Sequence, residues 1–284
     1  MVGRFAPSPT GDLHFGSLVA AVGSCLEARS AGGKWLLRIE DIDPPREVAG
    51  SAKSIIADLG RLGLVPDGPI LYQSNRLDAY RKALDQLLEK GLAYPCACSR
   101  KGLTKTGKYP GTCRNGIPPG KNPRSIRLFT NTCICTFIDK LQGPVSESPA
   151  ETSGDFIIRR ADGLFAYQLA VVVDDHFQGV TQVVRGADLL DSTCRQVCLQ
   201  KAFGWKSPDY MHLPVAVSTD GKKLSKRLRT DPVKHREPAS AVWQALQFLG
   251  QDPPSDLALD DLWKWALENW SSDLIPRVRE VMRL

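Results

Sequence analysis

A histidine, a glycine and a serine stand close together in the run "RFAPSPTGDLHFGS" at residues 4–17, where a helical pattern begins. The N-terminus of a helix presents free backbone N–H groups and favours phosphate. Gly16 lets a flat ring approach the backbone because it has no Cβ. His14 can donate to a phosphate oxygen as charge develops in a transition state. Taken alone, the pattern also fits an exposed turn.

Lysines suited to phosphate lie about 200 residues later, in the basic loop "GKKLSKR" at residues 221–227. The ammonium groups of Lys223 and Lys226 are compact charges that hold phosphate without a fixed fork geometry. A Gly-led loop of this kind can fold over a triphosphate, although alone it also fits a basic surface loop. Together, the two runs are a more specific indication of a site for a triphosphate than either run alone.

Three of the eight cysteines suggest a metal site: Cys96 and Cys98 form a C-x-C pair, and Cys113 follows 15 positions after Cys98. Structural zinc takes about four ligands near a tetrahedron and prefers thiolates. The cysteines and histidines nearby supply no obvious fourth ligand. Cys133 and Cys135 are a rival pair, but their alternation in "TCICTFID" favours a strand with both thiols on one face.

The remaining cysteines indicate packing. Cys25, Cys194 and Cys198 lie on helical patterns, where thiols are commonly buried. The N-terminus "MVGRF" shows no apolar secretion signal. We therefore expect a cytoplasmic protein without a disulfide framework.

The composition predicts a globular chain with a real core. Its 284 residues are 42% hydrophobic, and the net charge is +6. That charge is a modest bias towards polyanions, and a solvated surface explains it equally well. The longest apolar runs, such as "LAVVV" at 169–173, are far shorter than the roughly 20 residues that span a bilayer. No membrane partner is expected.

The pattern of elements that must position these groups is typical of an α/β fold with a parallel sheet. "KWLLRI" at 34–39 predicts a buried strand, and helical spacing follows at 51–64 and 77–91. "MHLPVAV" at 211–217 predicts another strand. The last 50 or so residues show two helical apolar stripes.

Several separated motifs then resemble one family. "HFGS" is similar to the HIGH signature, and "KLSKR" to the KMSKS signature, of class I aminoacyl-tRNA synthetases. "RFAPSPTGDLHFGS" with "LLRIEDID" resembles glutamyl-tRNA synthetases. The segment 155–193 matches the central signature of their shortened paralogues, the glutamyl-queuosine tRNA(Asp) synthetases, and only 57 residues follow Arg227. One departure is Ser17, which stands where HIGH has its second histidine.

The resemblance implies a Rossmann-type catalytic domain with an inserted zinc-containing subdomain and a helical C-terminal segment. The expected divisions are residues 1–92, the first catalytic half; 93–150, the insertion; 151–228, the second half; and 229–284, the helical segment. No anticodon-binding domain is expected.

The implied activity is ATP-dependent activation of L-glutamate to glutamyl-adenylate without tRNA. The glutamyl group then passes to queuosine at the wobble position of tRNA(Asp). The implied partners are L-glutamate, ATP with Mg²⁺, and a tRNA(Asp) anticodon stem-loop carrying queuosine. One structural Zn²⁺ and a monomer are expected.

Site residues follow from the positions that match the family's motifs. The catalytic set is His14, Lys223 and Lys226. The ATP-binding set is Pro9, His14, Gly16, Ser17 and Lys226. The glutamate-binding set is Arg4, Ser8, Glu40, Tyr167 and Arg185, with the arginines suited to the carboxylates and the acid to the ammonium. The zinc ligands are Cys96, Cys98, Tyr109 and Cys113, although water or another side chain could replace the tyrosine.

Alternatives remain open at this stage. The chain could be a truncated glutamyl-tRNA synthetase that charges a tRNA 3′ end, or a non-catalytic RNA-binding paralogue. The basic runs at 99–116 and 120–127 could meet RNA phosphates or form a solvated face. The sequence does not say which arginine takes which carboxylate, nor which residues hold queuosine.

Overall fold

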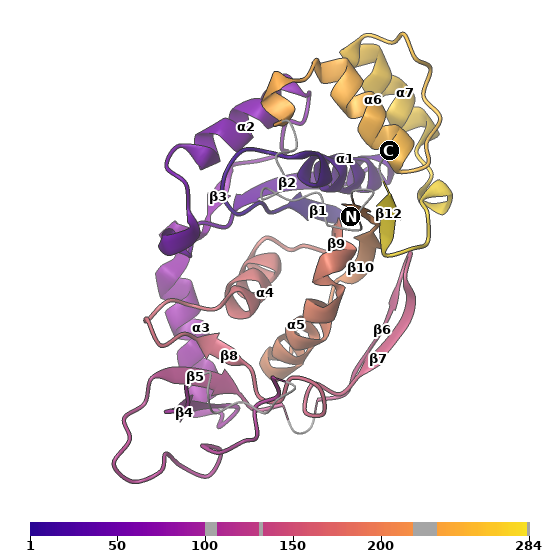
Figure 1. Ribbon diagram of the computed structural model, residues 1–284. Helices are drawn as coiled ribbons and strands as arrows, with labels where there is room; N and C mark the ends of the chain where they lie inside the picture. Colours follow the sequence, from indigo (N-terminus) through magenta and orange to yellow (C-terminus); the bar gives the residue numbers. More distant parts are fainter. Residues whose placement is uncertain (100–106, 131–132, 218–231, 283–284) are drawn as a thin grey trace.

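Helices cover a central sheet of mainly parallel strands, as the sequence predicts for an α/β fold (Figure 1). The computed structural model describes residues 1–99, 107–130, 133–217 and 232–282. The α-helices in this part are α1 (Phe15–Ser30), α2 (Ser51–Arg61), α3 (Leu77–Glu89), α4 (Tyr167–Phe177), α5 (Leu190–Phe203), α6 (Pro238–Phe248) and α7 (Leu259–Asn269). The strands are β1 (Val2–Phe5), β2 (Lys34–Ile39), β3 (Leu71–Tyr72), β4 (Ala93–Cys96), β5 (Ser125–Leu128), β6 (Cys135–Asp139), β7 (Gly143–Glu147), β8 (Ile157–Arg159), β9 (Gln182–Gly186), β10 (Asp209–Leu213), β11 (Val215–Val217) and β12 (Glu280–Met282).

The parallel strands form two groups that meet beside β1. Strands β1, β2 and β3 pair in that order, and β9 pairs with β10, which also pairs with β6. The N–H of Thr181, just before β9, donates to the carbonyl of Val2 in β1 at 3.0 Å. The chain order therefore reverses between β1 and β9, and ligands of such sheets bind at the carboxyl ends of the strands beside the reversal.

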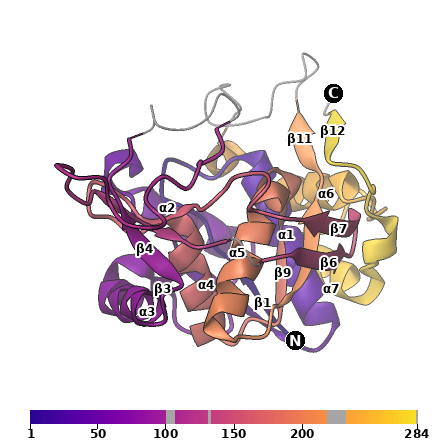
Figure 2. The same cartoon turned by 90° about the horizontal axis from the view of Figure 1, so that it is seen from below.

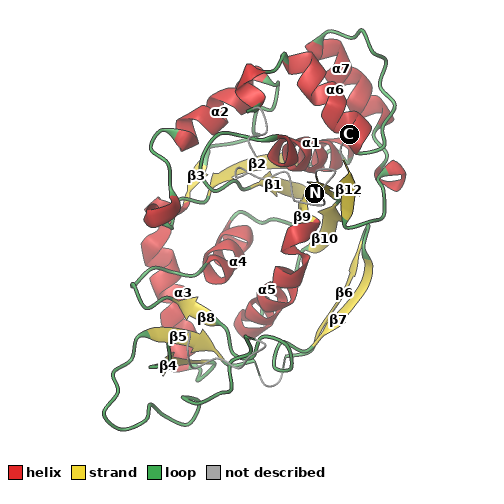
Figure 3. Cartoon of the chain, viewed as in Figure 1, coloured by secondary structure: helices red, strands yellow, loops and turns green. Residues whose placement is uncertain are grey.

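Helices lie on both sides of this sheet. Figures 1 and 3 show α1 on one side and α4 with α5 on the other. The C-terminal helices α6 and α7 cover the far side of α1. Because α1 lies between the sheet and these helices, it is buried nearly all round, from Leu18 to Leu26. The predicted C-terminal stripe is confirmed, since Val242 and Leu246 are buried against α1.

The expected insertion is built on a small antiparallel sheet, β4-β5-β8. Asp155, which is fully buried, ties this sheet together by accepting from Thr130 and from Arg114 at 2.6–3.0 Å. Strand pairing crosses the division expected at residue 150. Strand β8, which follows the division, pairs with β5 before it, and β6, which precedes the division, pairs with β10 after it. The division at 93–150 stays a prediction.

The predicted strand at 211–217 is two strands in the structure. Pro214 separates β10 from β11, because it has no N–H to donate and cannot continue a ladder. Strand β10 pairs with β9, whereas β11 pairs with β12 near the C-terminus. Figure 2 shows β11 and β12 side by side, extending away from the body of the sheet.

The expectation that the chain carries no disulfides is wrong for this structure. Cys133 is bonded to Cys198, and Cys135 to Cys194, with Cα–Cα distances of 5.8 and 5.3 Å. Cys133 and Cys135 share one face as predicted. That face packs against α5, where Cys194 and Cys198 lie one helical turn apart on the same side. Cys25 stays free and buried, and burial raises its pKa to about 12.

No helix in the described ranges is both long enough and apolar enough to span a membrane.

Close packing of α1 on the sheet gives a stability prediction. A Cβ at Gly23 would lie 2.7 Å from Leu213 Cδ1, whereas a Cβ at Gly60 in α2 would meet nothing within 4 Å. Both glycines lie within helices, where alanine is favoured over glycine. We therefore expect Gly23→Ala to be less stable than Gly60→Ala by roughly 1–3 kcal/mol, the usual cost of overpacking. Urea unfolding of the two variants measures the difference, and equal stabilities would contradict this close contact.

Candidate active site

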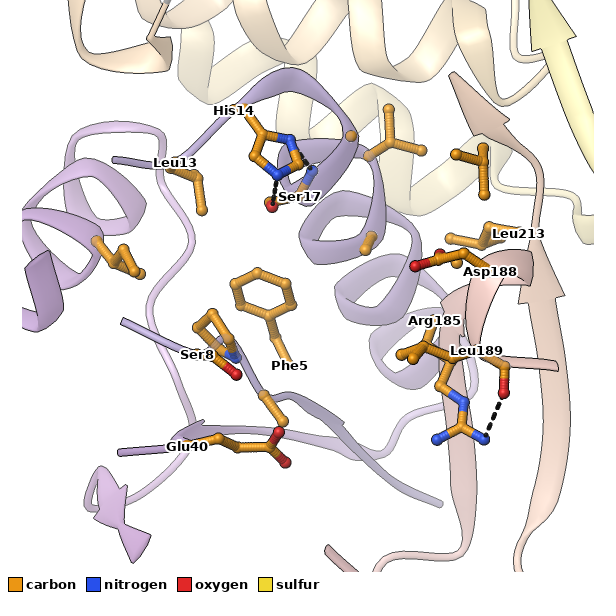
Figure 4. Close-up of a pocket in the computed structure, with 18 of the residues that line it drawn as sticks. Phe5, Ser8, Leu13, His14, Ser17, Glu40, Arg185, Asp188, Leu189 and Leu213 are labelled. Carbon is orange, nitrogen blue, oxygen red and sulfur yellow. Dashed lines mark hydrogen bonds between the residues drawn. The ribbon is translucent and has the colours of Figure 1, made fainter. Parts of the chain in front are cut away.

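One pocket lies where the carboxyl ends of β1, β2 and β9 meet the start of α1. Most of the predicted ATP and glutamate residues line it: Arg4, Ser8, His14, Gly16, Ser17, Glu40, Tyr167 and Arg185. In Figure 4, His14 and Ser17 lie at one end of the pocket, and Glu40 and Arg185 lie at the other. Two separately predicted sets thus share one cavity, as a reaction between glutamate and ATP requires.

Three predicted residues are not placed in this pocket. Pro9 is buried and is not among the lining residues, and its carbonyl accepts from Val48 N–H at 2.9 Å. Lys223 and Lys226 lie outside the described residues. Their assigned roles stay predictions.

His14 is the N-cap of α1. Its Nδ1 accepts from the backbone N–H of Ser17 at 3.3 Å, and its Nε2 lies 3.1 Å from the Ser17 hydroxyl oxygen. This capping bond satisfies one of the free N–H groups of the helix. The ring is therefore held against the first turn of α1, at the end of the helix that attracts phosphate.

A buried cluster of charged side chains contacts Arg4 and Glu40, two residues of the glutamate set. Asp175 in α4 lies 3.1 Å from Arg4 Nε and 2.8 Å from Arg38 Nη1, and Arg38 Nη2 lies 3.3 Å from Glu40 Oε1. All four side chains are at least nine-tenths buried. Burial raises the pKa of Asp175, but the two guanidinium groups outweigh it and leave the pKa below its usual value. Arg4 is thus fixed by a charged partner inside the protein.

Glu40 is the acid expected to meet the substrate ammonium. Burial raises its pKa, and the attraction of Arg38 and Arg4 only partly offsets that rise. A cation arriving beside Glu40 would favour its charged form. The side chain is therefore suited to a positively charged group in the pocket.

Arg185 has only neutral hydrogen-bond partners among the described residues. Its Nε donates to His212 Nε2 at 3.0 Å and its Nη2 to Thr193 Oγ1 at 2.8 Å. Longer bonds reach Tyr167 Oη at 3.4 Å and the Leu189 carbonyl at 3.5 Å, the latter drawn in Figure 4. A buried guanidinium held this way is ready for a carboxylate that comes with the substrate.

The residues that support the glutamate set were not predicted from the sequence: Arg38 and Asp175 beside Arg4 and Glu40, and Thr193 and His212 beside Arg185. Arg38 and Asp175 left a signal, because a charged residue inside each of two apolar runs needs a buried partner. Thr193 and His212 left none, since a threonine in a helix and a histidine in a strand are ordinary.

The predicted thiol cluster is assembled apart from this pocket. Sulfur atoms of Cys96, Cys98 and Cys113 lie within 4.8 Å of one another and can hold a metal ion. The Cys98 and Cys113 sulfurs are 3.7 Å apart, close to the roughly 3.8 Å that two thiolates take on tetrahedral zinc. Tyr109 Oη lies 3.4 Å from the Cys96 sulfur and 3.9 Å from that of Cys98.

Arg127 supports the same cluster from the side. Its Nε donates to the Cys96 sulfur at 3.3 Å, and its guanidinium lies 3.8 Å from the centre of the Tyr109 ring. Burial raises the pKa of Cys96, but hydrogen bonds with Tyr109 and Arg127 outweigh it and lower the pKa to about 7. The thiolate is the form that binds metals.

Comparisons with known proteins identify the family of this chain. The family model described as "tRNA synthetases class I (E and Q), catalytic domain" matches residues 1–239. The glutamyl-Q tRNA(Asp) synthetase of Dechloromonas aromatica is 52% identical over 287 residues, covering 97% of this chain and 95% of the relative.

Two solved structures of glutamate-tRNA synthetases share the fold. The glutamate-tRNA synthetase of Elizabethkingia anophelis has a TM-score of 0.84 at 26% identity, covering 100% of this chain and 68% of that one. The glutamate tRNA ligase of Elizabethkingia meningosepticum, solved in complex with its amino acid, has a TM-score of 0.82 at 27% identity, covering 99% of this chain and 66% of that one. The chain thus belongs to the class I tRNA synthetases of the E and Q family and, within them, to the glutamyl-Q tRNA(Asp) synthetases.

Proposed function

We propose that this enzyme activates L-glutamate with ATP, without tRNA, and transfers it to queuosine at the wobble position of tRNA(Asp). The observation that carries the proposal is the single pocket shared by the predicted glutamate set and the His14 end of α1. Family membership supports the same activity. Since tRNA is a cytoplasmic substrate, the enzyme is expected to act in the cytoplasm, with no membrane partner.

The charges around the pocket suit glutamate. The carboxylates of Asp175 and Glu40 together balance the charges of Arg4 and Arg38. Arg185 has no carboxylate among its hydrogen-bond partners in the described residues. Free glutamate carries two carboxylates and one ammonium, so one of its carboxylates can pair with Arg185. Glutamine carries only one carboxylate, so a charged group placed for the second carboxylate would lose its partner.

The first step needs position rather than a protein nucleophile. A carboxylate oxygen of glutamate attacks the α-phosphorus of ATP, and the bond to pyrophosphate breaks, which gives glutamyl-adenylate. His14 is placed to donate to phosphate as charge develops, and Lys223 and Lys226 are proposed to assist. ATP is expected to enter with Mg²⁺. An acceptor group of queuosine then takes the glutamyl group, and AMP leaves.

The thiol cluster is proposed to hold one structural Zn²⁺, through Cys96, Cys98 and Cys113 with Tyr109 as the fourth ligand. It lies at the junction of β4 with the loop before β5. A metal there would stiffen the insertion. It has no part in the chemistry at the pocket.

The activity is tested by glutamate-dependent ATP–pyrophosphate exchange without tRNA, followed by transfer of labelled glutamate. We expect exchange without tRNA, and label on tRNA(Asp) that carries queuosine, including a form that lacks the 3′-terminal adenosine. No label is expected on tRNA(Asp) without queuosine. Label on tRNA(Glu) that requires the terminal adenosine would favour the truncated glutamyl-tRNA synthetase. Failure to activate glutamate at all would favour the non-catalytic RNA-binding paralogue.

Charge selection at Arg185 gives a second prediction. Arg185→Gln removes the proposed partner of a substrate carboxylate, and truncating one member of a buried charge pair costs about 2–5 kcal/mol. We expect kcat/KM for glutamate to fall by roughly 30-fold or more, with the KM for ATP little changed. Arg81→Gln, at an exposed position of α3, is the control and should behave as the wild type. An unchanged glutamate KM in Arg185→Gln would remove this residue from the site.

Metal analysis tests the zinc proposal. We expect about one zinc per chain in the wild type and little in Cys98→Ser, because a tetrahedral site loses a thiolate. Cys25→Ala is the matched control, since Cys25 is a free cysteine in the core away from this cluster. Equal zinc in Cys98→Ser and Cys25→Ala would rule out the assigned ligands. Tyr109→Phe tests the fourth ligand separately.

A further inference from the structure

Two buried polar residues behind Arg185 have no part in the function proposed so far. His212 in β10 and Asp139 in β6 are 0% and 1% exposed. The Nδ1 of His212 lies 2.6 Å from Asp139 Oδ2, and its Nε2 accepts from Arg185 Nε at 3.0 Å. The imidazole therefore stands between a carboxylate and the guanidinium that faces the pocket.

The hydrogen bonds fix the form of the ring. Asp139 Oδ1 accepts from the backbone N–H groups of Leu141, Gln142 and His212 at 2.9–3.1 Å, which leaves Oδ2 for the imidazole. Burial raises the pKa of Asp139, but the bonds from His212 and Gln142 outweigh it and lower the pKa, so the group is a carboxylate. His212 then carries its proton on Nδ1 and offers the Nε2 lone pair to Arg185.

The ring is also neutral. Burial lowers the pKa of His212; Asp139 opposes this, and Arg185 and Arg4 add to it. The other groups beside the ring are Thr193, whose Oγ1 lies 3.2 Å from Nε2, and Tyr210, whose ring stacks on it. A neutral acceptor orients the guanidinium without placing a negative charge against an incoming carboxylate. This differs from Arg4, which bonds directly to Asp175.

We propose that His212, held in one tautomer by Asp139, is a positioning residue that fixes Arg185 for glutamate. The inference rests on the proposed function. It also connects the expected insertion to the substrate pocket, because Asp139 belongs to β6. The pair acts only through Arg185, so its effect falls on glutamate and not on ATP.

Two substitutions of His212 separate orientation from mere packing. Asn keeps an amide nitrogen near the position of Nδ1 but has no group at Nε2, whereas Gln can place an acceptor oxygen near Nε2. We expect the glutamate KM to rise about 10-fold in His212→Asn and to recover in large part in His212→Gln. The ATP KM should not change in either variant. Tyr210→Phe, which keeps the stacked ring, is the control and should keep the wild-type glutamate KM.

Asp139→Asn tests the tautomer without touching the histidine. If the Asn oxygen keeps the three backbone bonds, its amide NH₂ faces Nδ1, and the imidazole proton moves to Nε2 against Arg185. The glutamate KM should then rise as in His212→Asn. This variant also keeps the proposal testable if a His212 variant does not fold.

The pH profile provides a readout that a purely structural role would not change. Protonation of His212 removes the lone pair and adds a charge beside Arg185. Because the pKa is lowered, the wild-type glutamate KM should stay flat near neutrality and rise only below the ordinary histidine range of about 6.5. Protonation of Glu40, whose pKa is raised by burial, also weakens glutamate binding in acid, so His212→Gln should show a smaller acid rise than the wild type.

Glutamate binding by calorimetry and pyrophosphate exchange are measured on the same full-length variants. A glutamate KM equal to that of the wild type in His212→Asn and Asp139→Asn, or a fall in kcat alone, would overturn the proposal. The same acid rise in His212→Gln would also overturn it. A wild type that neither binds nor activates glutamate would instead refute the proposed function.

Discussion

The pocket depends on buried charge where the carboxyl ends of β1 and β2 meet α4. Four charged side chains, two arginines and two carboxylates, lie there almost fully removed from water. Buried ions are stable only when paired, and removing one member of such a set leaves an uncompensated charge. Asp175 is the central member because it contacts both Arg4 and Arg38. Because Asp175 lies on α4, these ion pairs hold that helix against the sheet beside the pocket.

The two arginines of the proposed glutamate set are held by different chemistry. Arg4 has a carboxylate partner, so its charge is already balanced before a ligand arrives. Arg185 is held by an imidazole, a hydroxyl and a carbonyl. These groups orient the guanidinium but do not balance its positive charge. This difference follows from the structure and was open in the sequence. It supports the proposal that Arg185 pairs with a carboxylate of the substrate.

Local patterns predicted much of the framework. The strand at 34–39 coincides with β2, and the apolar stripe containing Val242 and Leu246 is buried as expected. Arg4, Glu40 and Arg185 converge because each stands near the carboxyl end of a strand in one parallel sheet, where successive strands end at the same edge. That convergence was predicted from family resemblance, and its physical basis is the parallel order of the strands.

Contacts between distant segments were not predictable in the same way. Asp139 and His212 are 73 residues apart, and the two disulfides join cysteines 59 and 65 residues apart. Neither spacing leaves a local pattern, because the pairing depends on β6 lying beside β10 and against α5. Pro214 differs from these contacts because it is a local signal. Its missing N–H predicts a break in the strand at 211–217, although the apolar run around it favours one continuous strand.

Ser17 departs from the family's HIGH signature, and the structure shows what its side chain contacts. Its backbone N–H and its hydroxyl both contact the His14 ring, so the side chain that replaces a second histidine orients the first one. With Nδ1 accepting from the helix, a neutral His14 carries its proton on Nε2, the atom beside the Ser17 hydroxyl. A phosphate at this end of α1 can accept from the same nitrogen. The small residue thus holds the imidazole against the first turn of α1, where the proposed function places the phosphates of ATP.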